Sequence, residues 1–153
     1  RYANFGSFHE AHPGALHPAT AEILGWGKGY SAVELFKAQY VMAGYKQRAR
    51  EVLETTPFIV TPTTPTTFTK AELAADNIGR NALMGTYTNY VNLLDLCAIS
   101  VPSGFRADGL AQGLMIVGAP LADSRIAGLA HAFERARGGT LGATGNPLPE
   151  AGA

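Results

Sequence analysis

The sequence predicts an α/β fold, because amphipathic helical patterns alternate with short apolar runs that suit buried strands. The clearest helical patterns span residues 31–54 and about 123–137, and the apolar runs lie at residues 58–60, 98–101 and 113–118. The chain of 153 residues has the size of one domain. We therefore expect helices packed on a central sheet.

The first part of the chain predicts helices. Residues 1–25 suit one or two short helices, in which Pro13 and Pro18 can each occupy a first helical turn. A flexible glycine-rich turn is expected at residues 25–29. Ser31 stands three residues before Glu34, and this capping-box spacing predicts the start of a long helix over residues 31–54.

A short strand and a stiff loop follow the long helix. The continuous apolar run Phe58-Ile59-Val60 predicts a buried strand. The next segment, TPTTPTT, cannot be helical, because each residue before a proline is forced towards extended geometry. Loops beyond the carboxyl ends of strands line the ligand crevice in open α/β sheets. We therefore expect the loop from Thr61 to Thr64 to face the same crevice as the TYTN segment at residues 86–89.

The remainder of the chain predicts further helices and two strands. Short helices are expected near residues 71–75 and over about 81–95, with Gly85 as a bend. A buried strand over 98–101 is expected to end at Pro102, and a turn at 104–109 leads to a strand over 113–118. Asp123 is expected to cap the last helix, whose apolar face carries Ile126, Leu129, Ala130 and Phe133.

The composition excludes several classes of protein. Hydrophobic residues make up 46% of the chain and the formal net charge is zero, so neither a charged disordered chain nor a basic nucleic-acid binder is expected. No run of about 18 apolar residues suits a membrane span. The single cysteine, Cys97, excludes an intramolecular disulfide, and the four histidines lack the remaining ligands of a metal site. We expect no metal and no cofactor.

One stretch is unusually rich in hydrogen-bonding side chains. Six of the eight residues from Gly85 to Asn92 carry such groups, and the stretch leads directly into an apolar run. Polar groups that enter a core must be hydrogen-bonded, and a row of them beside a strand can form the wall of a polar pocket. A solvated helix face explains the same pattern, so both interpretations stay open at this point.

Three linked segments resemble the amidase signature family. They are FIVTPTTP at residues 58–65, YTNYVNLLDLCAISVPSGFRADGLAQGLMIVG at residues 87–118 and RYANFGSFHEAHPGALHP at residues 1–18. The second segment departs from the family pattern at Ala111, where proline is usual, and at Met115, where glutamine is common. The first eighteen residues and the GTYTNYVNLLDLC form look most like the allophanate hydrolases of this family. The resemblance covers residues 1–137.

The resemblance implies that residues 1–137 are the C-terminal portion of an amidase domain. That domain is an α/β/α sandwich with a mixed central sheet, incomplete in this chain. The family's catalytic lysine and two serines lie in N-terminal motifs that nothing here matches, so no catalytic residue is expected in this chain. The parent protein is expected to be a cytoplasmic homodimer or other homo-oligomer that releases ammonia from allophanate, in nitrogen use from urea or s-triazines.

The resemblance also implies substrate-binding residues. Arg1 matches the arginine of the family's ERYA segment, which binds the substrate carboxylate, and the pocket wall is expected to include Tyr87, Thr88, Asn89 and Asn92. The implied partners are a small amide or carboxylate substrate and the missing N-terminal part of the amidase domain, with neither nucleic acid nor a membrane. Two alternatives remain: another amidase-family enzyme, of the type found in amidotransferases, and a non-catalytic scaffold module.

The segment at residues 138–153 is expected to be a linker, because glycine, alanine and proline dominate it and it lacks apolar periodicity. We predict that its backbone amides exchange with solvent faster than those of residues 123–137. Hydrogen–deuterium exchange of the full-length protein, followed peptide by peptide, measures this difference. Equal protection of the two segments would contradict the linker assignment.

Overall fold

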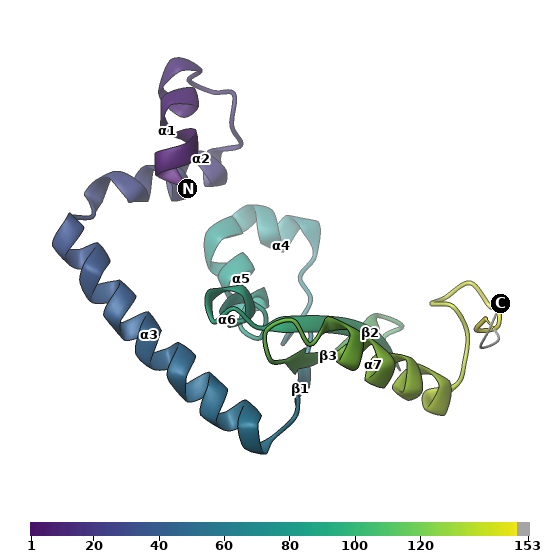
Figure 1. Cartoon of the computed structure of the whole chain (residues 1–153). Helices are drawn as coiled ribbons and strands as arrows, with labels where there is room; N and C mark the ends of the chain where they lie inside the picture. Colours follow the sequence, from purple (N-terminus) through teal and green to yellow (C-terminus); the bar gives the residue numbers. More distant parts are fainter. Residues whose placement is uncertain (150–153) are drawn as a thin grey trace. The chain divides into compact units, whose positions relative to one another are not determined.

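The computed structural model describes residues 1–149 and divides into two compact units (Figure 1). The first unit comprises residues 1–44 and 68–81, and the second comprises residues 45–67 and those from 82 onward. Two helices, α3 (Ala32–Thr55) and α5 (Asn77–Met84), carry the chain from one unit into the other.

The first unit begins with two helices that pack against each other, α1 (Tyr2–Ala11) and α2 (Pro18–Gly25). Both confirm the prediction of short helices in this region. Pro18 occupies the first turn of α2, where its missing N–H is not needed. Pro13 instead lies in the turn between the two helices and begins neither of them.

Residues 26–29 form a short 3₁₀ helix, η1 (Trp26–Gly29), and not the flexible turn that the sequence predicts. The backbone at Gly27 approaches Tyr2 so closely that a Cβ there would lie 2.6 Å from the Tyr2 Cβ. The glycine therefore permits close packing, which the sequence pattern does not reveal.

Helix α3 begins at the predicted capping box. The Glu34 N–H donates to Ser31 Oγ at 3.2 Å, and the Ser31 N–H donates to the Glu34 carboxylate at 2.8 Å. The hydrogen bonds from the Ser31 N–H and hydroxyl lower the pKa of Glu34. A second capping box, formed by Thr69 and Glu72, begins helix α4 (Lys70–Ala75) one residue before the predicted start. The sequence contains this signal as well, at the same three-residue spacing.

The second unit is built on a three-stranded sheet of β1 (Ile59–Pro62), β2 (Cys97–Phe105) and β3 (Ala111–Gly118). The strand order is β1-β3-β2, and both strand pairs are antiparallel. The described residues therefore form a small antiparallel sheet, whereas the mixed sheet is what the resemblance implies for the complete domain. The short turn between β2 and β3 explains one pair, because such a turn can join only antiparallel neighbours.

The two outer strands both extend beyond their predicted ends, because they lie at the edges of the sheet, where proline is tolerated. β1 runs through Pro62 and does not stop at Val60, and β2 continues past Pro102 to Phe105. Proline lacks the N–H that a central strand needs, but an edge strand tolerates it. Burial alternates along β1, so the Val60 side chain is 49% exposed instead of buried.

The helix predicted over residues 81–95 is broken into α5 and α6 (Asn89–Leu93). Between them the Thr86 hydroxyl donates to the Leu83 carbonyl at 2.6 Å, and the Asn89 N–H donates to the Gly85 carbonyl at 2.8 Å. A Cβ at Gly85 would lie within 2.7 Å of three atoms of the Asn89 side chain. The predicted bend at Gly85 is thus a complete interruption of the helix.

Helix α7 (Asp123–Arg137) packs against β2 and β3 and completes the core of the second unit. All four residues predicted on its apolar face belong to the core or pack against it. Asp123 is the first residue of the helix, and the capping position before it is held by Ala122. After α7, Thr140 and Pro147 are joined by an isolated β-bridge. Residues 150–153 of the predicted linker lie outside the described residues.

Gly118 provides a test of the packing between α7 and β3. A Cβ there would lie 2.7 Å from Ile126 Cγ2, and Ile126 is 3% exposed. Because the surrounding core leaves no space, we predict that Gly118→Ala lowers the free energy of unfolding by about 1–3 kcal/mol. Urea unfolding of the full-length protein measures this change.

Gly128 is the matched control, because it lies within α7 and nothing approaches its Cβ position. Gly128→Ala should raise the free energy of unfolding by about 0.5–1 kcal/mol through helix propensity. Equal effects of the two substitutions would contradict this account of the packing.

Candidate functional site

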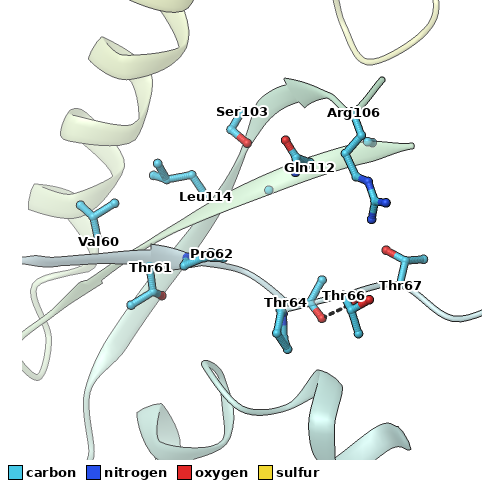
Figure 2. Close-up of a pocket in the computed structure, with 13 residues that line it drawn as sticks. Val60, Thr61, Pro62, Thr64, Thr66, Thr67, Ser103, Arg106, Gln112 and Leu114 are labelled. Carbon is cyan, nitrogen blue, oxygen red and sulfur yellow. Dashed lines mark hydrogen bonds between the residues drawn. The ribbon is translucent and has the colours of Figure 1, made fainter. Parts of the chain in front are cut away.

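A polar pocket lies in the second unit, where the threonine-rich loop after β1 (residues 63–67) meets the β2–β3 hairpin (Figure 2). Its cavity volume is about 360 Å³. The loop from Thr61 to Thr64 borders this cavity, in agreement with the expectation that it faces a crevice. The polar side chains of the lining belong to Thr61, Thr64, Thr66, Thr67, Ser103, Arg106 and Gln112.

The threonine-rich loop is held extended by its prolines and by two hydrogen bonds. The Thr63 N–H donates to the Gly113 carbonyl at 2.9 Å, which continues the β1–β3 pairing one residue beyond the strand. The Thr64 hydroxyl donates to the Thr66 carbonyl at 2.9 Å (Figure 2). Because the residues before Pro62 and Pro65 are confined to extended conformations, the loop presents its hydroxyls on a stiff backbone.

A β-bulge brings Ser103 to the pocket. Pro102 is opposite Gly113 and Gly104 is opposite Gln112, so Ser103 is the extra residue of β2. Gly104 has a φ of +132°, in the region that favours glycine. Bulges re-aim side chains in this way beside binding sites. Ser103 and Gln112 are missed by the sequence-based prediction, and the available signal is the proline and glycine that flank Ser103.

Arg106 supplies the positive charge of the pocket lining. Its guanidinium pairs with the Asp108 carboxylate at 2.7 Å, and the two side chains are 42% and 46% exposed. Asp108 also accepts a hydrogen bond from the Leu110 N–H at 3.2 Å, which holds the hairpin turn. Since Asp108 neutralises the arginine and the hydroxyls can both donate and accept, the pocket suits a small polar molecule better than a multiply charged anion.

Three hydroxyl side chains lie on one face of the sheet beside this pocket. The Thr63 and Ser100 hydroxyls hydrogen-bond at 2.6 Å, and a Cβ at Gly113 would lie 2.6 Å from the Thr63 hydroxyl. Thr61 lies on the same sheet face as Ser100, because both are paired with Met115. The Thr61 hydroxyl is buried and has no hydrogen-bond partner within residues 1–149. It therefore keeps its full capacity to donate and accept.

The four predicted wall residues lie elsewhere in the second unit. Tyr87 and Thr88 belong to the turn before α6, and Asn89 and Asn92 belong to α6. Tyr87 is half-buried, whereas the other three are exposed. None of the four lines the threonine-rich pocket.

Arg1 lies in the first unit, at the start of α1. Its carbonyl accepts hydrogen bonds from the Asn4 N–H at 3.1 Å and the Phe5 N–H at 3.0 Å, so its backbone is held by the first helical turn. Arg1 also borders an apolar cavity of about 710 Å³, whose walls include Phe5, Phe8 and Ile23. A guanidinium beside apolar walls is suited to bind a carboxylate through two parallel hydrogen bonds.

Within residues 1–149 we find neither a cluster of metal-ligating side chains nor a membrane-spanning helix, and the single cysteine is buried. Residues 1–149 contain no group of three or more histidine, cysteine, aspartate or glutamate side chains that could hold a metal ion. Over the same residues no helix combines the length and apolar character needed to cross a bilayer. Cys97 is buried, and its thiol donates to the Ala119 carbonyl at 3.1 Å, so it serves as a core side chain.

This chain matches a protein-family model and is similar to several known proteins. The family model described as amidase matches residues 8–127. The urea amidolyase of Saccharomyces cerevisiae is 36% identical over 135 residues, which is 87% of this chain and 7% of the yeast protein.

Two solved structures allow a closer comparison. A serine-to-alanine variant of Kluyveromyces lactis allophanate hydrolase matches with a TM-score of 0.81 and 32% identity, over 87% of this chain and 22% of that chain. The glutamyl-tRNA(Gln) amidotransferase protein from Thermotoga maritima matches with a TM-score of 0.68 and 30% identity, over 88% of this chain and 29% of that chain. The chain thus spans less than a third of the length of each of these proteins.

The hydroxyl pair at the sheet yields a prediction. Ser100→Ala removes the 2.6 Å hydrogen bond to Thr63 and should lower the free energy of unfolding by about 0.5–1.5 kcal/mol. Ser103→Ala, at the neighbouring bulge, should change it by less than about 0.5 kcal/mol, because within the described residues the half-buried Ser103 hydroxyl has no side-chain hydrogen bond like that between Ser100 and Thr63. Urea unfolding of the two full-length variants measures both values. A larger loss for Ser103→Ala than for Ser100→Ala would refute this assignment.

Proposed function

Because this chain belongs to the amidase family, we propose that it is the C-terminal portion of the amidase domain of an allophanate hydrolase. The observation that carries the proposal is the difference between two structural matches of almost equal coverage. The TM-score is 0.81 for the K. lactis allophanate hydrolase and 0.68 for the T. maritima amidotransferase protein. In this proposal residues 1–137 are part of an α/β/α sandwich that the rest of the domain completes, and residues 138–153 are a linker.

The proposed reaction of the parent protein is hydrolysis of the terminal amide of allophanate. A serine in the remaining part of the domain attacks the amide carbonyl, the C–N bond breaks, and ammonia leaves. Water then hydrolyses the acyl-enzyme. The reacting serines and lysine belong to family motifs that residues 1–153 do not match. The role of this chain is therefore to bind and orient the substrate.

In this proposal Arg1 binds the carboxylate of the substrate. Its guanidinium fork can form two parallel hydrogen bonds to a carboxylate, which a lysine ammonium cannot do. Arg1 precedes the residues matched by the family model, so its role is supported by the ERYA resemblance and by its place beside the apolar cavity. The exposed Thr88, Asn89 and Asn92, with Tyr87, supply hydrogen bonds to the polar part of the substrate.

A second candidate function is that of the amidase component of an amidotransferase. It is favoured by the 30% identity to the T. maritima protein over 88% of this chain. The two candidates differ in the amide that the parent protein hydrolyses and in whether a substrate carboxylate must be bound close to the reacting carbonyl.

The role of Arg1 can be tested in the full-length protein that contains this chain. Arg1→Lys keeps the positive charge but loses the fork, so KM for allophanate should rise on the order of ten- to a hundredfold, which corresponds to about 1.4–3 kcal/mol. KM for an uncharged amide substrate should change much less. Steady-state ammonia release measures both constants.

Arg48→Lys is the matched control, because Arg48 is an exposed arginine on α3. It should leave both KM values unchanged. An equal loss with charged and uncharged substrates in Arg1→Lys would show that Arg1 has a structural role and does not bind the carboxylate.

A further inference from the structure

Three side chains of the first unit meet next to Arg1. Glu10 Oε1 accepts hydrogen bonds from the Tyr2 hydroxyl and, at 2.6 Å, from Lys28 Nζ. Lys28 Nζ also lies 5.3 Å from the centroid of the Tyr2 ring, within the range of a cation–π interaction. This Tyr2 cluster (Tyr2, Glu10 and Lys28) joins the first turn of α1 to its last turn and to η1.

Two glycines hold the Tyr2 ring in place. A Cβ at Gly6 would lie 2.8 Å from two atoms of the ring, and a Cβ at Gly27 would lie 2.6 Å from the Tyr2 Cβ. Tyr2 therefore packs directly against backbone on both sides. Because Tyr2 is the residue after Arg1, its fixed ring restricts the backbone from which the Arg1 side chain projects.

The charges of the cluster are matched internally. The hydrogen bonds from Lys28 and Tyr2 lower the pKa of Glu10, and the hydrogen bond to Glu10 raises the pKa of Lys28, so both groups are charged at neutral pH. The Glu10 carboxylate is thus engaged by Lys28. Within residues 1–149 Arg1 forms no ion pair, so its guanidinium stays available to a carboxylate from outside.

We propose that Tyr2, Glu10 and Lys28 are positioning residues, which fix the start of α1 so that Arg1 is oriented for the substrate carboxylate. The inference rests on the proposed function of Arg1. The side chains of Glu10 and Lys28 are each 55% exposed, so their ion pair adds little to overall stability. Its effect is on orientation, because a pre-ordered arginine loses less conformational freedom when substrate binds.

The first test is Tyr2→Phe in the full-length protein. This substitution keeps the ring and its packing but removes the hydroxyl that binds Glu10. We expect KM for allophanate to rise about two- to tenfold, as for the loss of one hydrogen bond, while kcat stays nearly unchanged. Tyr40→Phe is the matched control, because Tyr40 is 73% exposed on α3, and it should change neither constant.

Lys28 provides a second variant on the surface. Lys28→Met removes the ion pair and should raise KM in the same way, whereas Lys28→Arg retains a cation and should restore KM towards the starting value. Thermal melting of every variant separates loss of folding from loss of positioning. A fall in kcat that matches the fall in melting temperature, without a change in KM, would overturn the proposal.

A double-mutant cycle decides whether the cluster acts through Arg1. In the Arg1→Lys background, Tyr2→Phe should add no further rise in KM, because the fork that it positions is already gone. Additive effects would show that Tyr2 acts independently and would overturn the positioning role alone. If Arg1→Lys itself leaves KM for allophanate unchanged, the proposed function of Arg1 fails and the positioning role fails with it.

Discussion

The packing of α7 on the β2–β3 hairpin is the contact on which the second unit depends. Ile116 of β3 is 2% exposed and shares its core cluster with Ile126 and Ala130 of α7, and Gly118 leaves room for Ile126 to lie directly against the strand. This contact fixes the hairpin. The fixed hairpin in turn presents the bulge at Ser103 to the threonine-rich loop, so the pocket is formed between a strand that the core holds in place and a loop that prolines keep stiff.

The sequence predicts those features that arise from local periodicity and capping. The apolar face of α7 follows from its helical spacing, and the start of α3 follows from Ser31 and Glu34. Features that depend on neighbours far away in the chain are not predictable in this way. Pro102 is tolerated in β2 because β2 lies at the edge of the sheet, and Gly85 lies so close to the Asn89 side chain that a Cβ would not fit there.

The candidate site also has one part that can be predicted from the local sequence and one part that cannot. The extended threonine-rich loop is predictable from its prolines, and it does border a cavity. Ser103 and Gln112 are not predictable, because a one-residue shift in register sets their placement. The two units carry different parts of the proposed substrate binding: Arg1 and the Tyr2 cluster belong to the first, and Tyr87, Thr88, Asn89 and Asn92 belong to the second. Exposed Phe36 and Val41 on α3 fit the proposal that the rest of an amidase domain covers this chain.

The substrate preference of the full-length protein distinguishes an allophanate hydrolase from an amidotransferase-type amidase. Purified protein that contains this chain is given allophanate or glutamine, and ammonia release is followed to obtain kcat/KM for each amide. We expect allophanate to be hydrolysed with the higher kcat/KM. Ammonia release from glutamine without release from allophanate would contradict the account and identify the parent protein as an amidase-family enzyme of the amidotransferase type.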